Sequence, residues 1–325
     1  MTLDILCILA GFILLIKGGD ILVDGSVAIA RRARLSAMVI GLTVMGFGTS
    51  APELLVSAQA AWRESAGIAL GNVAGSNISN IGLILGLTAA MRALPVGRRT
   101  LMVDMPFMLL AMGMLVGAAA WTGVIERWMG LIMMLTLIAF VVLEIRGERK
   151  RNKKDPGEEA DRAIGNDDVM PLWKAIGLVL LSLAAMVWGS NLLVDGASNV
   201  AMSLGKMMGV DPKEMERIVG LTVVALGTSL PELFASVMAA RKGETSMAVG
   251  NIIGSVSFNV LCVVGISSMI APISGAWHGF AADYAVMCAM GVLLWVFLRT
   301  GYRMVRWEGL VLLAGYAAYV WWLIF

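Results

Sequence analysis

The chain has 325 residues, of which 59% are hydrophobic and 15% charged, and its mean hydropathy is +0.83. That composition excludes a water-soluble domain and is typical of a polytopic protein in a lipid bilayer. A net charge of +2 gives no reason to expect a nucleic-acid partner. With one histidine and three scattered cysteines, zinc or copper chemistry is effectively excluded, and no cofactor is expected.

Apolar windows of about 20 residues, the length that spans a hydrocarbon core of roughly 30 Å, recur along the chain. They lie near residues 3–28, 37–61, 68–90, 101–120, 124–145, 173–203, 216–240, 247–270, 280–298 and 304–324. No basic residue precedes the first window, which continues into Asp20 and Asp24, so it does not resemble a cleaved signal peptide. We therefore expect an all-α membrane protein with ten transmembrane helices.

One hydrophilic stretch separates the first five windows from the last five. It begins with a basic run at 149–154 and ends in acidic residues and glycine, a composition typical of a flexible linker. The sequence thus predicts a first five-helix repeat (1–145), a cytoplasmic linker (146–172) and a second five-helix repeat (173–325). Most basic residues fall in loops on one face if both termini are outside, as the positive-inside rule favours. Short loops without a regulatory insert suggest a multi-pass protein of a prokaryotic inner membrane.

The two halves carry the same polar motif inside apolar windows. Residues 41–53 read Gly-Leu-Thr-Val-Met-Gly-Phe-Gly-Thr-Ser-Ala-Pro-Glu, and residues 220–232 read Gly-Leu-Thr-Val-Val-Ala-Leu-Gly-Thr-Ser-Leu-Pro-Glu. At this offset of 179 residues, 20 of the 46 positions from 41 to 86 are identical in the second copy. Five helices per half is an odd number, so homologous halves would cross the membrane in opposite directions. Such inverted repeats are common in secondary transporters.

Both copies place a glutamate, Glu53 or Glu232, at membrane depth. A carboxylate there costs roughly 2.5 to 3.5 kcal/mol even on lenient insertion scales, so two of them predict a compensating hard cation. Pro52 and Pro231 each lack an N–H and clash with the preceding turn, so both helices should break there. The carbonyls that these breaks free could also be satisfied by the cation.

Helical spacing places further oxygens beside each glutamate. The first copy supplies Thr49, Ser50, Ser57, Asn72, Ser76 and Asn80, and the second supplies Thr228, Ser229, Ser236, Asn251, Ser255 and Asn259. Carboxylate, amide, hydroxyl and carbonyl oxygens are the ligands that hard cations such as Ca²⁺ prefer. For the asparagines and serines at 57, 72, 236 and 251, packing hydrogen bonds are the simpler expectation.

These motifs resemble the two signature alpha-repeats of the sodium/calcium exchanger family, within the cation/Ca²⁺ antiporter superfamily. The resemblance rests on Gly48-Thr-Ser-Ala-Pro-Glu53, on Gly227-Thr-Ser-Leu-Pro-Glu232 and on Gly75-Ser-Asn-Ile-Ser-Asn80. It implies that Ca²⁺ and Na⁺ are the transported ions. The ligands it implies are Thr49, Ser50, Glu53, Ser76, Asn80, Thr228, Ser229, Glu232, Ser255 and Asn259, with backbone carbonyls of Gly46 and Ala225 completing outer sodium sites.

The chain departs from the family pattern at two positions. The second repeat has Val256 where the usual pattern has an asparagine after the serine. It also has Asn259 where some members, including potassium-dependent ones, carry aspartate, which weakens the case for potassium co-transport.

The sequence predicts a secondary active antiporter that exchanges Ca²⁺ for Na⁺ by alternating access. Two glutamates give the empty site a charge near minus two, so crossing the bilayer unloaded would carry a large desolvation penalty. A Ca²⁺/H⁺ antiporter remains the alternative, because paired carboxylates repel each other and can bind protons. A passive channel fits such a site less well, and no Ser/Lys, Asp/Asp or metal–histidine constellation supports an intramembrane enzyme. The sequence leaves the oligomeric state open.

Overall fold

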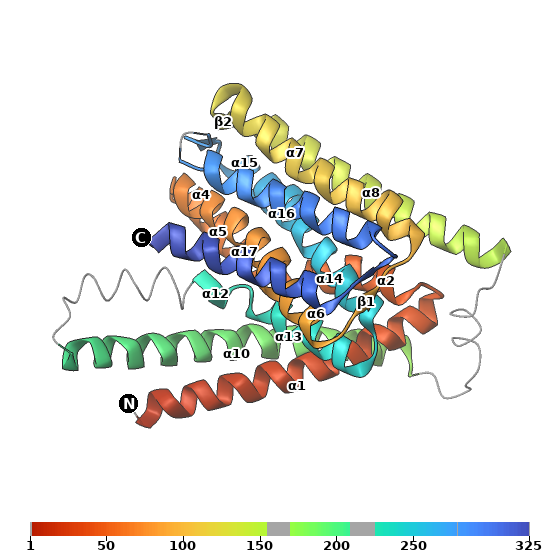
Figure 1. Ribbon diagram of the computed structural model, residues 1–325, viewed down its shortest axis with the longest axis horizontal. Helices are drawn as coiled ribbons and strands as arrows, with labels where there is room; N and C mark the ends of the chain where they lie inside the picture. Colours follow the sequence, from red (N-terminus) through yellow and green to blue (C-terminus); the bar gives the residue numbers. More distant parts are fainter. Residues whose placement is uncertain (1, 155–169, 209–224, 278, 325) are drawn as a thin grey trace.

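The computed structural model describes residues 2–154, 170–208, 225–277 and 279–324. Figure 1 shows a bundle of long helices, with α1 (Thr2–Ala33) and α10 (Leu172–Met207) lying side by side along one edge. The beginning of α1 and the end of α17 (Arg306–Ile324) both lie at the left of this view. The described parts of the two chain ends are therefore at the same end of the bundle.

The two halves have matching series of helices, in which η denotes a π-helical segment. The rest of the first half comprises α2 (Ala37–Ile40), η1 (Gly41–Met45), α3 (Gly46–Thr49), α4 (Ala51–Trp62), α5 (Ala66–Ser79), η2 (Asn80–Leu85), α6 (Gly86–Met91), η3 (Thr100–Asp104), α7 (Met105–Thr122) and α8 (Arg127–Lys154). The rest of the second half comprises α12 (Ala225–Gly227), α13 (Leu230–Lys242), α14 (Thr245–Phe258), η5 (Asn259–Val264), α15 (Gly265–Ile270) and α16 (Ala281–Arg299).

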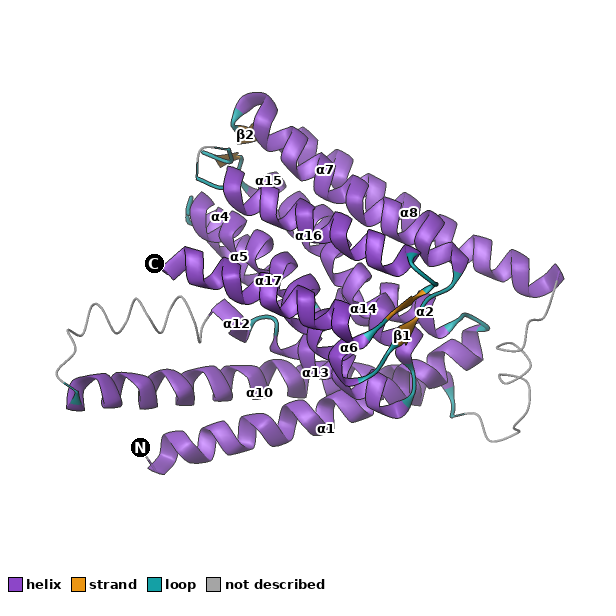
Figure 2. Ribbon diagram, in the orientation of Figure 1, coloured by secondary structure: helices purple, strands orange, loops and turns teal. Residues whose placement is uncertain are grey.

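Two short antiparallel ladders connect the halves (Figure 2). In one, β1 (Leu94–Pro95) pairs with β4 (Arg303–Met304), and in the other β2 (Val124–Ile125) pairs with β3 (Ile273–Ser274). Strand β3 follows β1, and β4 follows β2, by the same 179 residues that separate the two motifs. The repeat therefore extends in secondary structure beyond the region of sequence identity.

The protein is an all-helical membrane protein apart from these ladders. Seven described helical stretches are long and apolar enough to cross a bilayer, and there are eight if the bent pair Ala37–Thr49 and Ala51–Trp62 is one span. Part of the predicted window 216–240 lies outside the described residues, so the count of ten helices remains a prediction. Helix α8 continues past the predicted repeat end at residue 145, whereas residues 155–169 of the predicted linker lie outside the described part of the chain.

The predicted proline breaks are confirmed in both halves. Only Ser50 separates α3 from α4, which has Pro52 in its first turn, and the helices on either side are bent by 44°. Thr228 and Ser229 separate α12 from α13, which has Pro231 in its first turn. Proline is tolerated there because the first helical N–H groups have no partner within the helix. After each break, the new helix thus begins two residues before its glutamate.

Glycines allow close contacts in two places. A Cβ on Gly11 would lie 2.6 Å from the carbonyl oxygen of Gly189, so α1 and α10 approach each other closely as an antiparallel pair. A Cβ on Gly250 would lie 2.5 Å from the carbonyl oxygen of Met38, and one on Gly254 would overlap that of Leu42. Helix α14 therefore packs backbone to backbone against α2 and η1.

Candidate ion-binding site

The two glutamates lie in the protein interior at the start of two helices. Glu53 in α4 and Glu232 in α13 are both fully buried, and each occupies the first turn of its helix. Free N–H groups at a helix N-terminus favour negative charge nearby. Within the described residues neither carboxylate forms an ion pair with a basic side chain, so the protein itself leaves their charge largely uncompensated.

Serines from each half donate hydrogen bonds to the glutamate of the other half. Ser50 Oγ donates to Glu232 Oε1 at 3.3 Å, and Ser229 Oγ donates to Glu53 Oε1 at 3.4 Å. Ser76 Oγ also donates to Glu53 Oε1, at 3.4 Å. The Oε2 atoms of both glutamates are buried without a hydrogen-bond partner in the described structure. The two motifs therefore form one polar cluster with unused acceptor capacity.

Thr49 connects the first motif to α14. Its hydroxyl donates to the carbonyl oxygen of Met45 at 3.0 Å and lies 3.3 Å from Ser255 Oγ and 3.4 Å from Asn251 Oδ1. Ser255 Oγ in turn lies 3.5 Å from the carbonyl oxygen of Gly46. The structure thus brings together the hydroxyl and carbonyl oxygens that the sequence predicts from these two helices.

Asn72 and Asn251 have a packing role, as expected. Asn72 Nδ2 donates to Ser57 Oγ at 2.9 Å, and Asn251 Nδ2 donates to Ser236 Oγ at the same distance. Thr228 Oγ1 lies 3.4 Å from Asn72 Oδ1, which repeats the contact between Thr49 and Asn251 in the other half. The asparagine–serine bonds tie each glutamate helix to the helix that follows it, and the threonine contacts join the two halves.

Asn80 and Asn259 lie one helical turn after Ser76 and Ser255, so each shares the face of its serine. Both asparagines are fully buried and begin the π-helical segments η2 and η5. Neither polar atom of the Asn80 side chain has a partner in the described structure, nor does Asn259 Oδ1. Isolated π-helical turns occur frequently at functional sites. Ala225 is the first residue of α12, next to residues outside the described part of the chain.

The donor set suits a hard cation. The described residues contain no cluster of three or more His, Cys, Asp or Glu side chains that could hold a metal ion. A cation here would therefore combine two carboxylates with neutral hydroxyl, amide and carbonyl oxygens, a mixture that calcium sites use. The buried, unpartnered oxygens of Glu53, Glu232, Asn80 and Asn259 are the acceptors that it would satisfy.

Sequence reasoning did not identify the partner of one freed carbonyl. Pro231 leaves the carbonyl oxygen of Gly227 without its helical partner, and the sequence offered a cation as one group that could satisfy it. In the structure Ser190 Oγ of α10 donates to this oxygen. Sequence reasoning also missed Asn77, whose Oδ1 accepts a hydrogen bond from Asn259 Nδ2. Neither contact follows from periodicity within one helix, because each joins residues from different helices.

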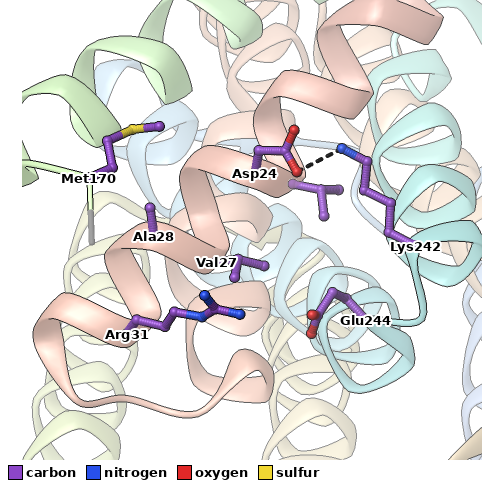
Figure 3. A pocket seen from close by; sticks show the side chains of 8 residues that line it. Asp24, Val27, Ala28, Arg31, Met170, Lys242 and Glu244 are labelled. Atoms are coloured by element: carbon purple, nitrogen blue, oxygen red, sulfur yellow. Dashed lines mark hydrogen bonds and ion pairs between the residues drawn. The ribbon is translucent and has the colours of Figure 1, made fainter. Parts of the chain in front are cut away.

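A cavity of about 440 Å³ lies outside this cluster, where α1 meets the turn between α13 and α14 (Figure 3). Its charged lining residues are Asp24, Arg31, Lys242 and Glu244. Lys242 Nζ lies 2.8 Å from Asp24 Oδ1 and donates to the carbonyl oxygen of Asp20. The Asp24 side chain is exposed. The cavity contains none of the predicted ligands.

Comparison with known proteins gives consistent matches along the chain. The family model described as sodium/calcium exchanger protein matches residues 3–146 and 174–325. CaxA of Alkalimonas amylolytica is 37% identical over 98% of this chain and 98% of its own length. The sodium/calcium exchanger MaX1 of Methanosarcina acetivorans is 31% identical, again with 98% of both chains covered.

A solved structure agrees over nearly the whole chain as well. The sodium-calcium exchanger NCX_Mj, soaked with 2.5 mM Na⁺ and 1 mM Sr²⁺, has a TM-score of 0.81 and 31% identity, covering 98% of this chain and 97% of that chain. The two segments that the family model matches include both glutamates and every predicted ligand. The chain therefore belongs to the sodium/calcium exchanger protein family, whose members are membrane transporters and not enzymes.

Proposed function

We propose that this protein is a secondary active antiporter that exchanges Ca²⁺ for Na⁺ across the inner membrane by alternating access. Its ten helices would form two five-helix repeats of opposite orientation, with both termini outside and the linker in the cytoplasm. The antiparallel pairing of α1 with α10 supports this arrangement, because it is the packing that inverted repeats would give their first helices.

The observation that carries the proposal is a pair of buried glutamates, each hydrogen-bonded by a serine of the other half. Glu53 and Glu232 are fully buried, each accepts a serine hydroxyl from the opposite half, and each keeps one oxygen without a partner. An empty site would hold two uncompensated charges at membrane depth, which is strongly unfavourable. One Ca²⁺, or Na⁺ ions in its place, would neutralise them. Only loaded forms would then interconvert, and this restriction enforces exchange.

The proposed ligands are the side chains that converge on this pair. They are Thr49, Ser50, Glu53, Ser76, Asn80, Thr228, Ser229, Glu232, Ser255 and Asn259, with the backbone carbonyls of Gly46 and Ala225 at outer sodium sites. Support comes from the hydrogen bonds that link the hydroxyls to the two glutamates and from the unpartnered amide oxygens beside them.

A Ca²⁺/H⁺ antiporter is the second candidate, and one feature of the site favours it. The hydrogen bonds that Glu53 and Glu232 accept are long, at 3.3–3.4 Å, and neither glutamate has a basic partner among the described residues. Protons could therefore neutralise the pair when Ca²⁺ leaves, as Na⁺ would in the first proposal.

Radiocalcium uptake into proteoliposomes tests both candidates. Vesicles loaded with Na⁺ are compared with K⁺-loaded vesicles and with vesicles that carry an imposed pH gradient. We expect uptake only when Na⁺ is inside. Uptake that follows the pH gradient and ignores Na⁺ would overturn sodium exchange and make the glutamates proton carriers.

A further inference from the structure

We infer that Asn77 is a positioning residue for the cation site: its amide holds the Asn259 side chain so that Asn259 Oδ1 faces the bound cation. The inference rests on the proposed function, because it assigns a task to a residue behind one of the proposed ligands. Asn77 is fully buried in α5 and forms no hydrogen bond with either glutamate.

The orientation of Asn77 follows from its neighbour on α16. Asn77 Nδ2 lies 3.6 Å from the sulfur of Met287. A thioether sulfur carries no hydrogen and can only accept, so the contact requires the NH₂ group of Asn77. Both side chains are fully buried, which leaves no water to compete for that donor. The carbonyl oxygen of Asn77 is consequently directed away from Met287.

The orientation of Asn259 follows from that of Asn77. Asn259 Nδ2 donates to Asn77 Oδ1 at 3.2 Å. Because Asn77 offers an acceptor here, the amide nitrogen of Asn259 must point toward α5 and its Oδ1 away from it. That oxygen is buried and has no partner in the described structure, on the helix face of Ser255. A reversed amide would instead present N–H groups to a cation and repel it.

The other half has no equivalent of the Asn77–Asn259 hydrogen bond. The position 179 residues after Asn77 is Val256, which can neither donate nor accept. Correspondingly, neither polar atom of Asn80 has a partner in the described structure, so this amide is not fixed by a neighbour. We therefore expect the loss of Asn77 to affect the ligand of the second half alone.

The test uses Asn77→Leu in the full-length protein and two measurements. The first is the Ca²⁺ concentration that gives half-maximal protection against thermal unfolding of the purified protein. The second is the kinetics of Ca²⁺ uptake into Na⁺-loaded proteoliposomes, which give the KM for Ca²⁺ and the maximal rate. Loss of a residue that orients a metal ligand lowers metal affinity by roughly 10- to 100-fold, so both the half-saturating Ca²⁺ and KM should rise about tenfold or more. The maximal rate should stay close to that of the wild type.

Epistasis with Asn259 separates positioning from general packing. Asn259→Ala alone should raise the half-saturating Ca²⁺, and Asn77→Leu added to it should change nothing further, since its effect passes through Asn259. Ser257→Ala is the matched control, because this buried hydroxyl donates only to Ile253 of its own helix. Additive effects in the double variant, or an unchanged half-saturation in Asn77→Leu, would overturn the inference.

A second variant covers the case in which Asn77→Leu does not fold. Met287→Leu conserves side-chain volume but removes the acceptor that orients Asn77, so it should raise the half-saturating Ca²⁺ in the same direction by a smaller factor. An unchanged value would contradict the inference that Met287 orients Asn77 and that Asn77 in turn orients Asn259. The protection assay needs no counter-ion. A wild-type protein that binds Ca²⁺ but shows no Na⁺-driven uptake would therefore refute the proposed exchange while leaving this test valid.

Discussion

The helices that hold the site and the α1–α10 pair differ in how much of their surface other helices cover. In the most apolar window of Thr245–Ile270, 94% of the residues are buried, and in that of Ala66–Met91 the share is 78%. In α1 and α10 it is only 28% each. The proposed ligands thus belong to a packed interior, whereas the pair lies along one edge of the bundle, with most of its surface facing outward (Figure 1).

This difference indicates a division of tasks between the two regions. Every described side chain that bonds to a glutamate comes from the interior helices or from the breaks between them. The pair packs on that region through a buried apolar cluster that includes Leu15 and Leu22 of α1. Two polar contacts are added by Ser190, at the break before α13, and by Lys242 of α13, which bonds to α1. Within our proposal the interior would determine which ions bind, and movement of the pair would determine how fast they cross.

Neutralising a glutamate should have the largest effect. In Glu53→Gln and in Glu232→Gln the remaining charge no longer matches Ca²⁺, and breaking a buried charge arrangement costs about 3–5 kcal/mol, more than about 100-fold in affinity. Radiocalcium uptake should fall to background in both variants. Glu64→Gln, an exposed carboxylate just after α4, is the control and should transport normally. Continued exchange in either glutamate variant would break the assignment of the site to the interior.

Crowding the interior should affect folding itself. In Gly254→Ala the added methyl group would overlap the carbonyl oxygen of Leu42, so two backbones must separate, and overpacking of this kind costs about 1–3 kcal/mol. We expect a lower thermal unfolding midpoint in detergent. Gly113→Ala on the exposed side of α7 is the control, since no described atom lies within 4 Å of the added methyl group. Equal midpoints for the two variants would mean that the interior packs less tightly than the structure indicates.

Crowding the pair should slow transport without weakening binding. In Gly11→Ala the added methyl group would lie 2.6 Å from the carbonyl oxygen of Gly189. If this strain raises the free-energy barrier for movement of the pair by about 1 kcal/mol, the maximal uptake rate drops about fivefold. The half-saturating Ca²⁺ concentration should stay the same. Ile13→Val, on the outward-facing side of α1, is the control. A change in Ca²⁺ half-saturation would show that the pair takes part in binding.

Removing an exposed ion pair between the two regions should have the smallest effect. The Lys242–Asp24 ion pair is partly exposed, with side-chain exposures of 29% and 64%, and such pairs contribute about 0.2–1 kcal/mol. Lys242→Met should change the uptake rate less than about fivefold, with the difference shrinking at high salt. Arg241→Met is the control, because Arg241 forms no ion pair with a described residue. A salt-independent effect would point to lost packing rather than lost charge.

Features that depend on one helix were predictable from the sequence. Pro52 and Pro231 identified both breaks, because proline disrupts the helix in which it lies. The burial of Glu53 and Glu232 followed from their apolar surroundings and the repeat. The spacing of Ser76 and Asn80 predicts that they share one helix face, and both residues are buried.

Features that depend on how helices cross were not predictable from the sequence. The bond from Asn259 to Asn77 joins residues 182 positions apart, and that from Ser190 to the Gly227 carbonyl joins different helices. Periodicity describes the faces of one helix and does not state which face of another it meets. The ladders of β1 with β4 and β2 with β3 are two residues long per strand, too short to give an alternating pattern.

The same ladders bear on how the protein is made in the cell. Strands β1 and β2 of the first half both take their partners from the second half, as does α1, which packs on α10. During synthesis the first half therefore leaves the ribosome with two strand edges and a glycine-lined helix face uncovered until β3, β4 and α10 have been produced. Neither half can form these contacts alone, so they are complete only after β4 has been synthesised.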